Sequence, residues 1–121
     1  MEKKTEKENK LILIPKIEKY IEYMLQICIK LPRTEKFSIG NEYKTSMYEM
    51  LKDVMLLNKE YRLELINKID ANLNTQRIYL RIMKKYIWID ERKFKIAMEQ
   101  IYEIGKIVGG LIKYYAKNNK K

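Results

Sequence analysis

The sequence contains no histidine, which removes the commonest general base and the commonest metal ligand in proteins. Metal sites of the di-iron type in helical bundles use Glu-x-x-His pairs, so that class of site is excluded as well. The single cysteine, Cys28, has no partner for an internal disulfide, and this favours a reducing compartment. We therefore expect a protein that is not an enzyme and that holds no metal or other cofactor.

Long apolar runs are also missing. The first ten residues, MEKKTEKENK, are polar, and the LILI that follows is too short for the apolar region of a secretory signal. No apolar run approaches the ~18 residues that a membrane-spanning helix needs. The sequence therefore predicts a cytoplasmic protein without a membrane-spanning segment.

Proline and glycine are scarce, with two and four copies, whereas 46 % of the residues are hydrophobic and 35 % are charged. This bias is typical of long helices rather than of a β fold. The length of 121 residues fits one domain with one core. We expect a disordered polar tail over 1–14, a helical domain over 15–117 and a basic tail over 118–121.

Apolar residues recur at alternating spacings of three and four, the pattern of amphipathic helices, in four segments. The first predicted helix covers roughly 15–31, with Pro15 in its first turn. The second covers roughly 36–58, and either Thr34 or Ser38 is expected to be its N-cap.

The other two segments have the most regular repeats. The third helix carries its apolar stripe from Ile66 to Ile87, and the fourth from Phe94 to Tyr115, with Asp90 as the N-cap of the fourth. Four such helices with short connections predict an all-α, antiparallel up-down-up-down four-helix bundle. The stripes are wider than one core requires, so the extra apolar residues either flank the core or form a second face for self-association.

Three of the four glycines lie in the segment EIGKIVGG at 103–110, within the fourth predicted helix. Gly105 falls on the apolar stripe and Gly109 lies one turn later, so the missing side chains would let another helix backbone approach closely. Alternatively, Gly109 and Gly110 end the helix as a cap, although LIKYY continues the register and favours an unbroken helix. In both cases the glycines are structural, because a phosphate-binding loop opens a helix after a strand.

Positive charge is abundant, with a net charge of +10. Small basic domains often bind nucleic acid, but a lysine-rich surface can also be a compositional bias. No acidic residue lies between Asp70 and Asp90, and three cations in this gap follow the i, i+4, i+8 spacing of one helical ridge. The predicted nucleic-acid-binding residues are Arg77, Arg81, Lys84, Lys85, Arg92, Lys93 and Lys95.

Aromatic residues are interleaved with these cations. Tyr79, Tyr86 and Trp88 either stack on bases or pack inward, and inward packing is favoured for Trp88. A second group of lysines near the C-terminus is explained as well by the helix dipole and by solubility as by binding.

Two motifs occur in the same order in one family: LPRTEKFSIG at 31–40 and EIGKIVGG at 103–110, with arginines between them on the third helix. On these residues the chain resembles the Avd-like four-helix bundle proteins over 16–116. These are the accessory variability determinants of diversity-generating retroelements, with relatives encoded in bacterial ribosomal-RNA intervening sequences. The chain departs from the family at Leu111, where tryptophan often follows the paired glycines.

The resemblance implies a bundle that assembles into a homopentameric barrel and binds RNA, DNA and a reverse transcriptase. It further implies a role in the mutagenic copying of a template repeat. The intervening-sequence relatives imply an alternative, a structural or interaction protein with no direct nucleic-acid role. A third hypothesis is peripheral membrane binding through LILI and the C-terminal lysines.

Overall fold

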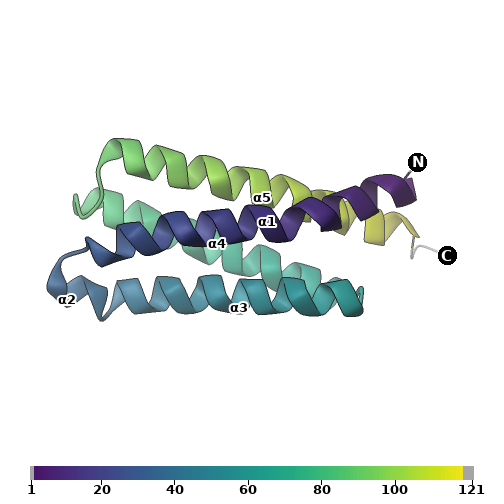
Figure 1. Ribbon diagram of the computed structural model, residues 1–121, viewed down its shortest axis with the longest axis horizontal. Coiled ribbons are helices and arrows are strands. Elements are labelled where there is room, and N and C mark those ends of the chain that lie inside the picture. Colours follow the sequence, from purple (N-terminus) through teal and green to yellow (C-terminus); the bar gives the residue numbers. More distant parts are fainter. Residues whose placement is uncertain (1, 119–121) are drawn as a thin grey trace.

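The computed structural model describes residues 2–118, and this part of the chain is helical, with no strand. The helices are α1 (Glu2–Ile29), α2 (Arg33–Lys36), α3 (Ile39–Lys59), α4 (Leu63–Lys85) and α5 (Glu91–Asn118). The four long helices run antiparallel, and the short α2 turns the chain between α1 and α3 (Figure 1). The predicted four-helix bundle is confirmed.

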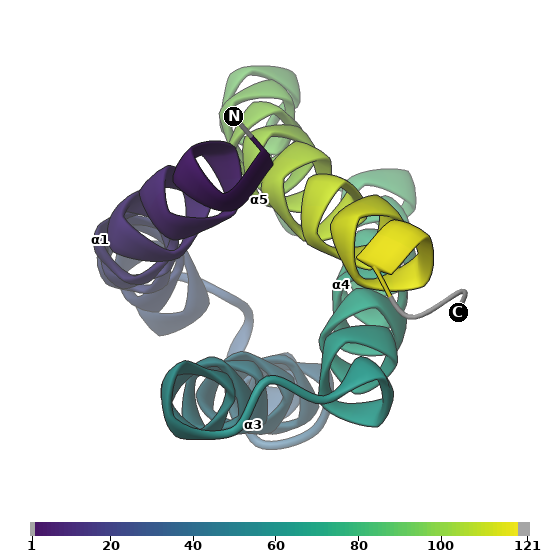
Figure 2. The same cartoon turned by 90° about the vertical axis from the view of Figure 1, so that its right-hand side faces the viewer.

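Seen end-on, the long helices occupy the corners of a square in the order α1, α3, α4, α5 (Figure 2). Each one packs against two neighbours, so α3 and α5 are diagonal to one another. The predicted apolar stripes supply the core, in which Tyr20, Met47 and Ile66 are fully buried. No described helix combines the length and the hydropathy that a membrane span requires.

The N-terminal part of the chain differs from the prediction. α1 begins at Glu2, so residues 2–14 are helical rather than a disordered tail, and Pro15 lies inside the helix instead of in its first turn. Lysine and glutamate are good helix formers, and Leu13, only 1 % exposed, extends the core stripe one turn beyond Ile17. Met1 and residues 119–121 of the predicted basic tail lie outside the described residues.

The start of α3 is also different in detail. The helix begins at Ile39 rather than at 36, because the preceding residues form the separate α2. Ser38 occupies the N-cap position, but its hydroxyl donates to Glu35 at 3.2 Å and makes no capping bond. Thr34 lies within α2, so the predicted side-chain cap is absent from this helix start.

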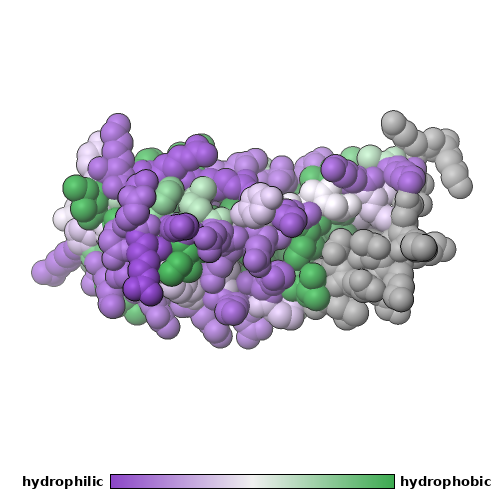
Figure 3. Space-filling view, turned by 90° about the horizontal axis from the view of Figure 1, so that it is seen from above, coloured by the Kyte–Doolittle hydropathy of each residue, from purple (hydrophilic) through white to green (hydrophobic). Residues whose placement is uncertain are grey.

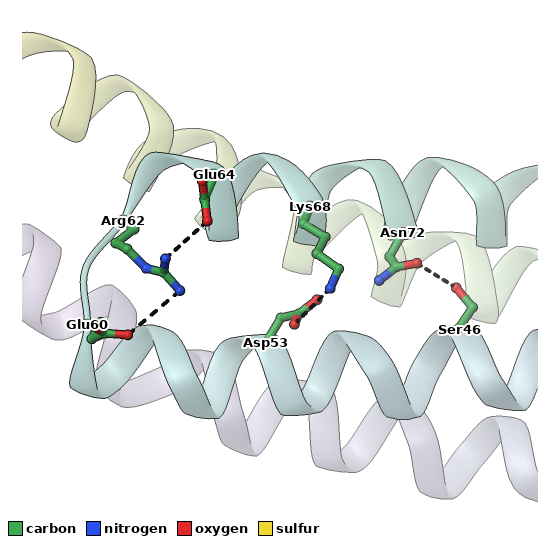
Figure 4. A network of polar contacts seen from close by, with 7 residues as sticks. All are labelled: Ser46, Asp53, Glu60, Arg62, Glu64, Lys68 and Asn72. Atoms are coloured by element: carbon green, nitrogen blue, oxygen red, sulfur yellow. Dashed lines mark hydrogen bonds and ion pairs between the residues drawn. The ribbon is translucent and has the colours of Figure 1, made fainter.

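A chain of hydrogen bonds crosses the core and joins α1, α3 and α4. Tyr20 donates to Gln76 Oε1 at 2.6 Å, and because a phenol has one hydrogen, Tyr43 is the donor in its own bond to Tyr20. Gln76 Nε2 donates to Ser46 at 3.2 Å, and the Ser46 hydroxyl donates to Asn72 at 3.3 Å (Figure 4). Each hydroxyl in this chain reaches an acceptor, so the network fixes the register of α4 against α1 and α3.

Ion pairs continue this seam between α3 and α4 toward the connection of the two helices (Figure 4). Lys68 Nζ lies 3.7 Å from the nearly buried Asp53 carboxylate. Arg62 bridges Glu60 and Glu64 at 3.7 and 3.0 Å. These last three side chains are largely exposed, so they orient the turn more than they stabilise the fold.

The connection from α4 to α5 is a Schellman turn. The Trp88 N–H donates to the Met83 carbonyl at 2.9 Å, and the Ile87 N–H donates to Lys84 at 3.0 Å. Ile87 therefore takes φ = 60° and is 84 % exposed, so the prediction that it continues the core stripe is wrong. Asp90 Oδ1 accepts the Lys93 N–H at 2.8 Å, which confirms Asp90 as the N-cap of α5.

Ile87→Gly should stabilise the bundle, because a β-branched residue is strained at a positive φ that glycine adopts freely. We expect a gain of about 1 kcal/mol in unfolding free energy and a rise of roughly 4 °C in Tm, measured by thermal denaturation. Ile87→Ala is the control, since it also removes the exposed side chain but keeps the strained Cβ. An equal gain in both variants would contradict this explanation.

Candidate nucleic-acid interface

The seven predicted binding residues follow α4 and continue onto the first turns of α5. We name them the basic strip: Arg77, Arg81, Lys84, Lys85, Arg92, Lys93 and Lys95. Because α4 is continuous to Lys85, the i, i+4, i+8 spacing places Arg77, Arg81 and Lys85 along one side of it. The antiparallel connection brings the end of α4 beside the start of α5, so the two parts of the strip meet at this end of the bundle (Figure 1).

Arg77 is one of three half-buried members of the strip, and it reaches across to α5. A Cβ at Gly105 would lie 2.7 Å from its Nη2, and its Nη1 donates to Asn74. The guanidinium therefore occupies the space that the missing side chain of Gly105 leaves. This corrects the prediction that Gly105 admits a neighbouring helix backbone.

The other two glycines of EIGKIVGG lie in an unbroken α5, so the helix continues through them as predicted and they do not form a cap. A Cβ at Gly109 would have no neighbour within 4 Å. Gly109 therefore makes no close helix contact within the described chain, contrary to the prediction. Gly110 lies in the same continuous helix.

Lys84 is the one member of the strip with an ion pair among the described residues. Its Nζ lies 3.2 Å from Glu91 and 4.7 Å from the centre of the Phe94 ring. This lysine is held against α5 by both contacts, and Glu91 offsets its charge. The other six cations of the strip have no carboxylate within 4.0 Å in the described structure.

The helix dipole separates the strip into two parts. Lys84 and Lys85 lie in the last turn of α4, where cations complement the dipole. Arg92 and Lys93 lie in the first turn of α5, where cations oppose it, and Lys95 follows them. Helix stability does not explain this second group, which makes it the stronger sign of a binding role.

The aromatic residues near the strip have different surroundings. Trp88 is half-buried against the core, which confirms its predicted inward packing. Tyr79 also packs against the core, and its ring centroid lies 6.3 Å from that of Tyr43. Tyr86 is 60 % exposed, and its ring stacks on Trp88 with centroids 5.2 Å apart and planes at 21°. Tyr86 therefore combines an exposed ring with a fixed support.

A further group of cations lies at the same end and was missed by sequence reasoning. Lys30, Arg33 and Lys36 belong to the connection from α1 to α3, far from the strip in sequence. The antiparallel topology places this connection at the end where α4 joins α5 (Figure 1). Arg33 in LPRTEKFSIG, combined with the up-down order of the helices, predicts a cation at this end of the bundle.

The described residues hold no group of three or more Cys, Asp or Glu side chains that could bind a metal ion. Cys28 is buried, as predicted, and burial raises the pKa of its thiol to about 11. The thiol is therefore protonated at neutral pH and is a poor nucleophile.

The face seen from above α5 is mostly hydrophilic, with small separate hydrophobic patches (Figure 3). One of these patches lies at the end of the bundle where α4 joins α5. The surface therefore combines cations and apolar side chains at this end.

Comparison with known proteins gives one family. Residues 11–115 match a family model described as bAvd-like. A search of curated proteins finds none that matches the chain. The matched segment includes both LPRTEKFSIG and EIGKIVGG and all of α3 and α4. The earlier resemblance is thus confirmed, and the chain belongs to the bAvd-like family.

Proposed function

We propose that this protein is a non-enzymatic, nucleic-acid-binding accessory of a diversity-generating retroelement reverse transcriptase. Family membership supports the accessory role. The observation that carries the binding role is the basic strip, in which six cations lack an ion pair among the described residues, two of them against the dipole of α5.

The proposed mechanism is electrostatic. Arginine and lysine side chains neutralise phosphates and release condensed counterions, which gives tight binding with little sequence preference. Arg77, oriented by Asn74, presents a planar guanidinium, while Arg81 and Lys85 extend into solvent. The strip is suited to holding a template RNA or an RNA–DNA hybrid by its backbone.

We further propose assembly into a homopentamer. A shallow groove of about 480 Å³ on the outer face of α5 is lined by Phe94, Met98 and Tyr102, with charged residues at its rim. Tyr102 is 63 % exposed, and the open space over Gly109 leaves room for a close neighbour. Five copies of a chain with net charge +10 would carry +50 and would bind a long polyanion with avidity.

A second candidate is a structural or interaction protein without a direct nucleic-acid role. It is favoured by Tyr48, Met55 and Leu56 on α3, which are 42, 53 and 40 % exposed. Such a group suits contact with another protein. On this reading the positive charge is compositional.

Electrophoretic mobility shifts of labelled RNA and DNA over a range of salt concentrations distinguish the two candidates. We expect retardation at micromolar protein that weakens steeply with salt. The double variant Arg77→Ala with Arg81→Ala should reduce the slope of log K against log salt by about 2 while the bundle stays folded. Absence of retardation near physiological salt would favour the second candidate, and a solution mass measurement tests the pentamer.

A further inference from the structure

Four of the five most exposed large apolar side chains among the described residues lie at one end of the bundle. Ile87 is 84 % exposed, Phe37 72 %, Ile29 68 % and Tyr86 60 %. Ile29 ends α1, and the other three come from the α1–α3 and α4–α5 connections, which lie at the same end (Figure 1). Among the large apolar residues described, only Tyr102 has a comparable exposure of 63 %.

The α4–α5 turn holds two of these residues in a fixed geometry. The Schellman bonds place Ile87 at φ = 60°, a strained conformation for this residue type. Tyr86 and Trp88, on either side of it, stack nearly parallel at 5.2 Å. Trp88 is packed against the core, so it fixes one face of the Tyr86 ring and leaves the other toward solvent.

Cations lie at the same end of the bundle as this aromatic pair. Lys85 and Arg92 flank the turn in sequence, and Arg33 lies in the connection at the same end. Of the acidic residues in the turn, Glu91 is paired with Lys84 and Asp90 caps α5. A flat ring beside unpaired cations matches a nucleotide, with its base on the ring and its phosphate on the cations. An apolar protein surface would leave these charges without partners.

We propose that the Tyr86–Trp88 pair is a stacking platform for an unpaired nucleobase, so that this end of the bundle binds single-stranded nucleic acid. The inference rests on the proposed nucleic-acid function and narrows its ligand. Bases inside a duplex are already stacked and cannot reach the ring. The basic strip contacts phosphates and therefore accepts both single-stranded and duplex nucleic acid.

The test uses Trp88, the only tryptophan in the chain, as its own reporter. A short oligouridine and an RNA duplex of equal length are titrated into the full-length protein at the same salt concentration. We expect oligouridine to change the Trp88 emission. Tyr86→Ala should weaken oligouridine binding about tenfold and leave duplex binding unchanged. Tyr86→Phe, which keeps the ring, should retain the single-strand affinity.

The outcomes separate this inference from the proposed function. Equal affinities of Tyr86→Ala and the unaltered protein for oligouridine would overturn the platform, even if duplex binding persists, and would leave this end as a protein-contact surface. An equal loss for both ligands would overturn it too, because a stacking site discriminates between them. Failure of the unaltered protein to bind either RNA would instead remove the proposed function and the platform together.

Discussion

Replacing Gln76 with leucine is expected to lower the free energy of unfolding by about 2 kcal/mol, although leucine is the more hydrophobic residue. Gln76 is fully buried and accepts the Tyr20 hydroxyl at 2.6 Å. Without the amide, Tyr20 and Tyr43 still form a hydrogen bond with one another, but this bond uses only one of their two hydroxyl hydrogens. One buried O–H therefore remains without an acceptor, whichever tyrosine donates.

The control removes both tyrosine hydroxyls together with the Gln76 amide. The triple variant Tyr20→Phe, Tyr43→Phe and Gln76→Leu leaves no phenolic O–H in this hydrogen-bonded chain, so most of the loss should be recovered. Chemical denaturation of the three proteins at neutral pH measures the difference. If Gln76→Leu is as stable as the unaltered protein, the hydrogen-bonded chain contributes nothing net to stability.

Gln76 also shows how far the sequence predicts this fold. Its position on the apolar stripe of the third helix was evident, and the periodicity placed the stripe correctly from Ile66 to Met83. Its partners were not evident, because Tyr20, Tyr43 and Ser46 come from other helices. Periodicity identifies the buried face of a helix but not which side chains of separate helices meet there.

The errors occurred where tertiary contacts or backbone bonds override a local pattern. The polar segment before Pro15 looked like a tail, but the burial of Leu13 extends the helix through it. Ile87 fits the 4/3 spacing, yet the Schellman turn ends the helix before it. The spacing predicts a contact between backbones at Gly105, whereas its neighbour is the side chain of Arg77.

The candidate site was easier to predict along a helix than across helices. Arg77, Arg81 and Lys85 needed only the helical repeat, and α4 places them on one side as expected. Their role in binding stays a prediction. Arg33 was missed, because its nearness to the strip depends on the order of the helices rather than on spacing within one of them.

Reversing two charges of the strip, Arg81→Glu with Lys85→Glu, is expected to weaken nucleic-acid binding by roughly a hundredfold near physiological salt. Two phosphate contacts are lost, and two carboxylates then repel the backbone. Both side chains are exposed and without ion pairs among the described residues, so the fold should be unaffected. Mobility shifts measure the affinity, and circular dichroism checks the helices.

The matched control is Lys52→Glu with Lys59→Glu on α3. Both lysines are exposed and lie on α3, which carries no residue of the strip and ends, with Lys59 in its last turn, at the end of the bundle away from the α4–α5 connection (Figure 1). Each reversal lowers the charge by two, so either double variant carries +6 instead of +10. A change in total charge alone acts equally in both variants, whereas a localised site is damaged only by the α4 pair. Equal weakening would show that the excess of lysine, and not the arrangement on α4 and α5, attracts the polyanion.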